Sequence, residues 1–176
     1  EKDARSLRHG MTESQLEPGK QETLNAAIAA CARRFAETRD LDLILRDAVS
    51  IIRDVIGLDR AGIFLYNADD HVWHGVFGTD LDGTIRDEHR LTMPPDQRHP
   101  IHRTERGEGD EFFHENFAAD FPDDAFMANV RNCFFIALRA HGKLLGGISV
   151  DNMETGRAID PATREALRQF ARYIAL

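Results

Sequence analysis

The most constraining feature of the sequence is a pair of short, almost wholly apolar segments, Asn132–Ala140 and Lys143–Asp151, separated only by His141 and Gly142. Two such runs joined by a two-residue turn predict an antiparallel β-hairpin. Because successive residues of both segments are apolar, both faces of the hairpin have to be buried. The sequence therefore predicts a sheet that is covered on both sides.

Two helices are predicted in the N-terminal part of the chain. In residues 21–38 the large apolar side chains recur at helical spacing and form one stripe, made of Leu24, Ile28, Cys31 and Phe35. Asp40 is a suitable N-cap for a second helix, whose broad apolar face ends at Gly57. The stripe of the first helix could pack on the domain itself or on a second copy of the chain.

A third helix is predicted at the C-terminal end, where Asp160 is a suitable N-cap and Pro161 suits the first helical position. Its apolar stripe consists of Leu167, Phe170, Ala171 and Ile174. Between the helices, residues 60–66 and 71–79 predict a second hairpin, and residues 84–91 predict a further strand near an edge. We therefore expect an α+β layer fold with an antiparallel sheet of about five to six strands.

Composition limits the classes of function. The 176 residues fit one domain, which we place at 21–176 after a polar tail or linker at 1–20. A formal net charge of -8 disfavours nucleic acid as a partner. Two cysteines are too few for a disulfide framework, and no apolar run is long enough for a membrane helix. We expect a cytoplasmic domain without membrane contact.

Periodicity disappears between Pro94 and Asn132, where we expect a long excursion with one or two helical turns near residues 123–130. Acidic residues and phenylalanines alternate within it, and phenylalanines at this density favour burial. The excursion is either a hydrophobic lid over a pocket or an ordinary satellite core beneath a long loop, and the sequence favours neither.

The segment Leu145–Asn152, followed by Arg157–Asp160 and Leu167–Ala171, resembles the C-terminal part of GAF domains. The helix at 41–56 and the strand at 60–66 are similar to the N-terminal part. The resemblance implies terminal helices on one face of the sheet, which often dimerise, and a small-molecule pocket on the other face. It also implies an output domain in the same full-length chain, such as a kinase, cyclase, phosphodiesterase or transcription regulator.

We therefore predict a regulatory, small-molecule-sensing and dimerisation domain of a bacterial-type signalling protein, and not an enzyme. The predicted pocket residues are the aromatic side chains of the sheet face and the excursion: Phe64, Tyr66, Trp73, Phe113, Phe117, Phe126 and Phe135. A shift of strand parity by one would replace Phe64 and Tyr66 with Ile63 and Leu65. The predicted homodimer contacts lie on the terminal helices: Leu24, Ile28, Cys31, Phe35, Leu167, Phe170 and Ile174.

The alternative function is a ligand-free dimerisation or spacer module, whose pocket is filled by its own phenylalanines. The identity of a cofactor cannot be derived from the residues. His99, His102 and His114 lie in the excursion, but they lack the tight spacing of a metal site, so we expect no metal. Cys133 lies in an apolar strand, where a thiol usually serves as core packing. The excursion holds no cysteine, which disfavours a bilin-attaching or sulfoxide-reducing GAF domain.

Overall fold

The computed structural model describes residues 18–93 and 98–176, except for the side chain of Phe35. The predicted tail up to residue 17 and the start of the excursion at Pro94 lie outside the described residues. One antiparallel sheet has the strand order β3-β2-β1-β6-β5-β4. Its strands are β1 (Arg60–Asn67), β2 (Val72–Thr79), β3 (Ile85–Asp87), β4 (Glu111–His114), β5 (Cys133–Ala140) and β6 (Lys143–Asp151). The α+β fold predicted from the sequence is confirmed.

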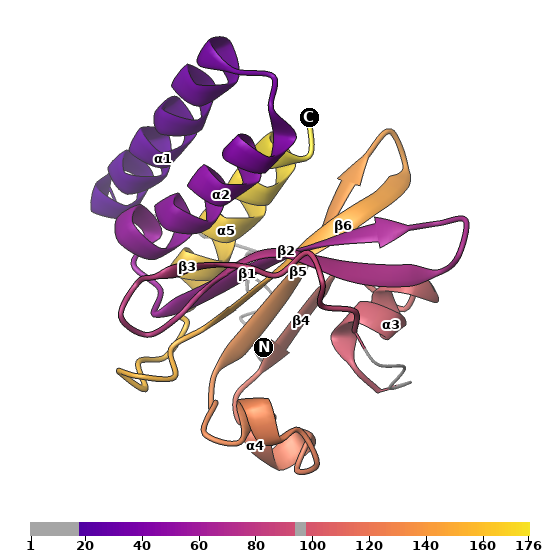
Figure 1. Ribbon diagram of the computed structural model, residues 1–176. Helices are drawn as coiled ribbons and strands as arrows, with labels where there is room; N and C mark the ends of the chain where they lie inside the picture. Colours follow the sequence, from indigo (N-terminus) through magenta and orange to yellow (C-terminus); the bar gives the residue numbers. More distant parts are fainter. Residues whose placement is uncertain (1–17, 94–97) are drawn as a thin grey trace, which may run out of the picture.

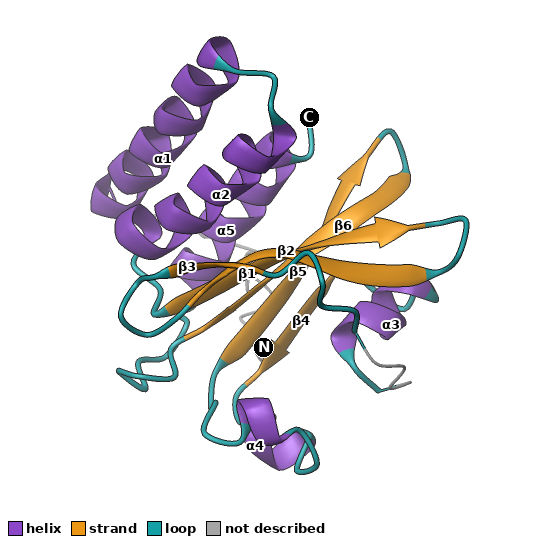
Figure 2. Cartoon of the chain, in the orientation of Figure 1, coloured by secondary structure: helices purple, strands orange, loops and turns teal. Residues whose placement is uncertain are grey.

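Three helices, α1 (Pro18–Glu37), α2 (Leu41–Ile51) and α5 (Pro161–Ile174), gather on one face of the sheet (Figures 1 and 2). The Asp40 side chain caps α2, accepting hydrogen bonds from the backbone N–H groups of Asp42 and Leu43. The helix continues as a π-helical turn to Ile56 and ends at Gly57, which has a φ of 88°. A left-handed residue of this kind favours glycine, which explains why the predicted helix stops there.

The last helix starts as its sequence predicts. Asp160 accepts a 2.7 Å hydrogen bond from the backbone N–H of Thr163, and Pro161 follows it. Lys20 of α1 donates to the same carboxylate at 2.8 Å, which joins the first helix to the start of the last. The hydrogen bonds from Lys20 and Thr163 outweigh the effect of burial and lower the pKa of Asp160 to about 2.

The apolar stripes of the terminal helices are used inside a single chain. The main core between the helices and the sheet contains Leu24, Cys31, Leu167 and Phe170, each no more than 3 % exposed. These four side chains are therefore not available at the surface for the homodimer contact expected from their spacing. Ile28 and Ile174 are half-buried and pack against the edge of this core.

The hairpin of β5 and β6 turns at His141 and Gly142, as predicted, and β6 lies between β5 and β1. Two glycines of β6 are required by close neighbours. A Cβ atom at Gly147 would lie 2.3 Å from the buried Phe135 ring, and one at Gly146 would lie 2.1 Å from the Phe64 carbonyl oxygen. The sheet therefore packs more closely at this point than any side chain permits.

The excursion contains more regular structure than the sequence predicts. Besides the 3₁₀ turn η2 (Ala125–Met127), it forms α3 (Pro100–Glu105), the edge strand β4 and the short helix α4 (Phe117–Asp120). The four-residue β4 pairs with β5, whose partner residues lie 19 to 25 positions later in the chain. Its strand structure thus depends on a non-local partner that a periodicity argument does not detect.

Candidate functional site

A cavity of about 820 Å³ lies against the sheet, on the face opposite the helical core. Its floor is formed by Gly62 of β1, Gly78 of β2 and Ser149 of β6. The surrounding wall comes from two stretches of the chain, residues 86–93 together with 98–101, and residues 121–127. The volume lies within the usual range for a small-molecule pocket.

Much of the cavity wall is apolar. Apolar or aromatic side chains line it from both sides: Phe64, Leu91, Met93, Ile101, Phe121, Phe126 and Met127. Side chains alternate between the two faces of a strand. The sheet residues that precede and follow the floor residues therefore pack into the helical core on the opposite face. Ile148 and Val150, which flank Ser149, are fully buried there. One layer of sheet therefore separates the cavity from the helices.

A nearly buried ion pair forms one part of the wall. The Arg60 Nε lies 3.0 and 3.1 Å from the two carboxylate oxygens of Asp151, and Nη2 lies 2.7 Å from Oδ2. The two side chains are only 12 % and 8 % exposed. Arg60 Nη2 also lies 3.4 Å from the sulfur of Met127, so the pair links β1 and β6 to the segment that covers them.

A second pair is formed by Arg86 of β3 and Glu88. Arg86 Nη2 donates to Glu88 at 2.9 Å, and Nη1 lies 3.1 Å from Asp80. Glu88 lies over β2 at two glycines. A Cβ atom at Gly78 would lie 2.5 Å from the Glu88 carboxylate, and one at Gly75 would lie 2.9 Å from the Glu88 backbone carbonyl oxygen. Burial raises the pKa of Glu88, in opposition to the Arg86 guanidinium. These glycines provide the space for a half-buried carboxylate in the cavity wall.

Phe126 projects from η2 beside both ion pairs. Its ring centroid is 5.5 Å from the guanidinium carbon of Arg60 and 5.6 Å from that of Arg86. These distances are within the range of cation–π contacts. Nevertheless 62 % of the side chain remains exposed, an unusually large fraction for a phenylalanine. The ring is therefore held by two cations and leaves most of its apolar surface in contact with water.

The predicted pocket residues separate into four locations. Phe64 and Phe126 line the cavity. Trp73 and Phe135 form an adjacent cluster with Tyr66 packed against it, and Phe64 and Ile101 connect this cluster to the cavity wall. Phe117 belongs to a third cluster with Phe121 and Cys133.

Phe113 lies on the opposite face of the sheet, against the helical core, with its ring 4.3 Å from the Arg164 guanidinium carbon. Its neighbour Phe112 takes the cavity side instead, next to Phe135. The expectation that Phe113 lines the pocket is therefore wrong, because adjacent residues of a strand point to opposite faces, and Phe112 packs into the cluster beside the cavity instead of lining it.

The sequence argument overlooked Arg60, Asp151 and Glu88. Arg60 and Asp151 stand at the ends of two apolar strands, and their pairing follows only from the register of β1 with β6. The sequence signal that could have revealed this ion pair is the charged residue at the end of each apolar strand. Arg90 and Arg98 also line the cavity.

The histidines of the excursion are distributed among separate contacts. His114 Nδ1 lies 2.6 Å from Asp120, and the ring of His99 lies beside those of Phe117 and Phe121. His102 Nδ1 lies 3.5 Å from Glu105. Within residues 18–93 and 98–176, no three His, Cys, Asp or Glu side chains are grouped so as to hold a metal ion.

Glu105 instead joins α3 to the first hairpin. The Tyr66 hydroxyl donates to Glu105 at 3.1 Å and lies 2.8 Å from His71 Nδ1. Burial, together with the neighbouring Glu105, raises the pKa of Tyr66 to about 12. The phenol therefore stays protonated and keeps its hydrogen bond at neutral pH.

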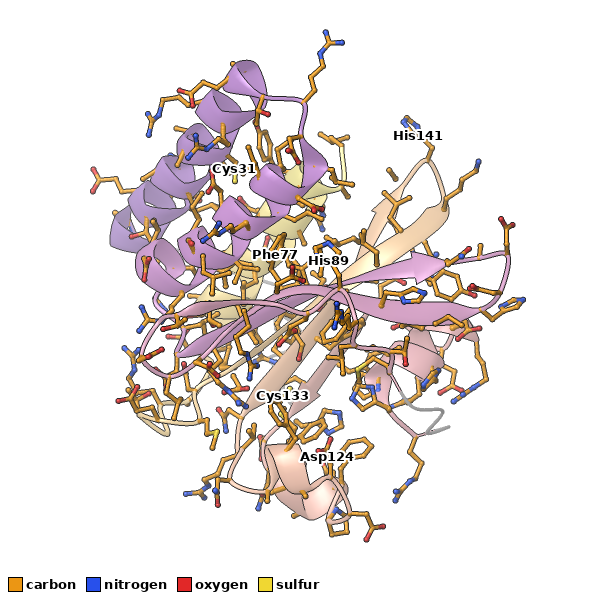
Figure 3. The ribbon with its side chains drawn as sticks, viewed as in Figure 1. Cys31, Phe77, His89, Asp124, Cys133 and His141 are labelled. Carbon is orange, nitrogen blue, oxygen red and sulfur yellow. The ribbon has the colours of Figure 1, made fainter. Side chains whose placement is uncertain are left out.

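Both thiols are buried, and neither lines the cavity. Figure 3 labels Cys31 among the helices and Cys133 at the start of β5. Burial, helped by Asp47, raises the pKa of Cys31 to about 11. Burial, helped by Asp151, raises the pKa of Cys133 to about 12. Neither is suited to act as a nucleophile, because the reactive form is the thiolate.

No described helix is both long and apolar enough to cross a membrane.

A six-stranded antiparallel sheet with three helices on one face and a cavity on the other is an α+β layer architecture. A model of the GAF domain family matches residues 40–176. The chain therefore belongs to the GAF domain family, and the resemblance seen in its sequence is confirmed.

Solved structures agree with this fold. The GAF domain of an Acinetobacter phosphoenolpyruvate-protein phosphotransferase aligns with a TM-score of 0.69 and 12 % identity over 91 % of this chain and 92 % of that one. A phycoerythrobilin-bound GAF domain from a cyanobacterial phytochrome aligns with a TM-score of 0.72 and 12 % sequence identity, over 88 % of this chain and 94 % of that one. Residues 122 to 287 of a methyl-accepting chemotaxis protein align with a TM-score of 0.67 and 19 % sequence identity, over 82 % of this chain and 92 % of that one. No curated protein sequence matches the chain.

Proposed function

We propose that this domain is a regulatory module that binds a small molecule in the cavity and transmits its occupancy to an output domain in the same full-length protein. The observation that carries the proposal is the cavity of about 820 Å³ on the sheet face opposite the terminal helices. A ligand there contacts Ser149, whose neighbours Ile148 and Val150 pack into the helical core. Small shifts of β6 would thus alter the packing of α5, which is the form of coupling that two-state regulation needs.

The domain acts in this proposal by binding, not by catalysis, and in the cytoplasm. The two free thiols fit a reducing compartment. The bilin of the phytochrome relative belongs to that protein. Neither cysteine of this chain lines the cavity, and the buried Cys133, whose Sγ lies 3.8 Å from Ser149 Oγ, keeps its thiol protonated. We therefore look for a ligand held by non-covalent contacts.

The other candidate, a ligand-free dimerisation or spacer module, requires phenylalanines that fill the pocket. Phe126 remains largely exposed beside a cavity that is still open, which supports the sensor over the spacer. Homodimerisation through the terminal helices remains a separate proposal, for which Ile28 and Ile174 offer half-buried apolar surface. Ile28→Glu should lower the mass measured by light scattering to that of one chain, and an unchanged dimer mass would reject α1 as the contact.

Ligand binding is tested by screening metabolites for an increase in the melting temperature of the purified domain. A ligand at a hundred times its Kd stabilises the folded state by about 2.7 kcal/mol. For a chain of this size that corresponds to roughly 5 to 10 °C. Native mass spectrometry of the same mixtures then gives the mass of the ligand.

Gly62→Val provides the matched control, because a side chain at this floor position projects toward the cavity. A Cβ atom there would lie 3.5 Å from the Phe64 ring, an ordinary van der Waals distance, and valine suits a strand. The variant should fold normally and lose the ligand-induced shift. A shift that persists in Gly62→Val would place the ligand elsewhere.

A further inference from the structure

The most buried charges of the cavity wall already neutralise one another in ion pairs. Four arginines and five acidic residues line it, and the two innermost pairs, Arg60 with Asp151 and Arg86 with Glu88, are joined by hydrogen bonds of 2.7 to 3.1 Å. A ligand with a net charge would place an unpaired charge against these pairs and lose its hydration there. A ligand whose charges sum to zero avoids this loss.

Four of the five remaining charges of the wall lie nearer to water, since Arg90, Arg98, Asp87 and Asp123 are exposed. The fifth, Asp124, is half-buried and accepts a 3.2 Å hydrogen bond from the Met127 backbone N–H. Asp87 is hydrogen-bonded to the backbone N–H of His89 and lies 2.7 Å from the His89 ring nitrogen Nδ1. Charges at such positions are screened and discriminate weakly between ligands. The selectivity for charge therefore comes from the two inner pairs.

The exposed ring of Phe126 determines the shape of the ligand. Arg60 and Arg86 hold the ring at the cavity, yet 62 % of the side chain has no covering partner. An aromatic ring is best covered by another flat ring, in an offset-stacked or edge-to-face contact. Arg86 and Glu88 beside it supply a hydrogen-bond donor and an acceptor for the polar edge of such a molecule.

We propose that the cavity binds a flat aromatic molecule that carries no net charge, either uncharged or zwitterionic, with its ring against Phe126. This inference rests on the proposed function and specifies the chemistry of its ligand. The two inner ion pairs reject anions and cations, and Phe126 selects the flat ring.

A matched set of phenylalanine derivatives tests the charge requirement on the 176-residue chain by isothermal titration calorimetry. The probes are L-phenylalanine (zwitterion), N-acetylphenylalaninamide (uncharged), N-acetylphenylalanine (anion) and phenethylamine (cation). The two probes without net charge should bind at least tenfold more tightly than the two charged ones. Tighter binding of either charged probe, or binding by none of the four, overturns the proposed ligand class.

L-cyclohexylalanine, which has the same charges as phenylalanine but no flat ring, tests the shape requirement. It should bind at least fivefold more weakly than phenylalanine, and equal affinity overturns the role of the aromatic contact. Phe126→Leu should remove the same preference. Phe113→Leu is the matched control, because Phe113 also packs near a guanidinium but lies on the helical face; it should leave both affinities unchanged.

These outcomes are separable from those of the proposed function. A metabolite that raises the melting temperature of the wild type but not of Gly62→Val keeps the cavity as a ligand site whatever the phenylalanine series shows. If that metabolite carries a net charge or lacks a flat ring, the ligand class proposed here is overturned while the sensor function stands.

Discussion

Removing the Asp151 carboxylate should be among the most destabilising single changes in the sheet. Asp151→Ala leaves the Arg60 guanidinium, which is only 12 % exposed, without its carboxylate partner. It also removes the acceptor of the 3.0 Å hydrogen bond from the Met153 backbone N–H. Breaking a buried ion pair from one side typically costs about 3 to 5 kcal/mol. Because the pair lines a cavity that admits water, we expect about 3 kcal/mol.

Urea unfolding followed by the fluorescence of Trp73 measures this loss, since Trp73 is the only tryptophan and is fully buried. The double variant Arg60→Met with Asp151→Leu should recover much of the stability, because it leaves no unpaired charge. Asp110→Ala is the control: its ion pair with Arg139 has a distance of 2.7 Å but is solvent-exposed, and it should cost less than about 1 kcal/mol. A loss below about 1 kcal/mol for Asp151→Ala would refute the reasoning.

Three further predictions concern packing, capping and thiol chemistry. Gly147→Ala should destabilise the domain by about 1 to 3 kcal/mol in urea unfolding, because its Cβ atom would displace the buried Phe135 ring; an unchanged midpoint would contradict this. Asp160→Ala should cost about 1 kcal/mol as a lost N-cap. The folded pKa of Asp160 is about 2 and lies below the unfolded value of about 3.9. The ionised carboxylate therefore stabilises the fold above about pH 4, and this contribution should disappear as the pH falls from about 4 to 2. Equal acid-unfolding curves for the wild type and Asp160→Ala would contradict this. Cys31 and Cys133, with pKa values raised to about 11 and 12, should react with a thiol reagent at pH 8 far more slowly in the folded than in the urea-unfolded chain, and equal rates would contradict their burial.

Local signals in the sequence predict the elements that depend on local interactions. The cap at Asp160, the stop at Gly57 and the two-residue turn at His141 each act within a few residues, and all three are present in the structure. The sheet class follows from the apolar runs that these signals separate.

The site is harder to predict because its parts meet only through pairing between distant strands. Arg60 meets Asp151 through the register of β1 and β6, and Glu88 is buried because two glycines of β2 leave room for it. The choice between Phe112 and Phe113 depends on the register of β4, which no periodicity within four residues can fix. The stripe of α1 likewise fits a second copy or the domain itself, and only the packed structure shows that it serves the domain.

A crystal structure of the domain with the metabolite that raises its melting temperature tests the proposed sensor most directly. We predict electron density for the ligand between the floor at Gly62 and the ring of Phe126, on the sheet face opposite α1 and α5. Density for the ligand at any other place, with this cavity left empty, would contradict the proposal.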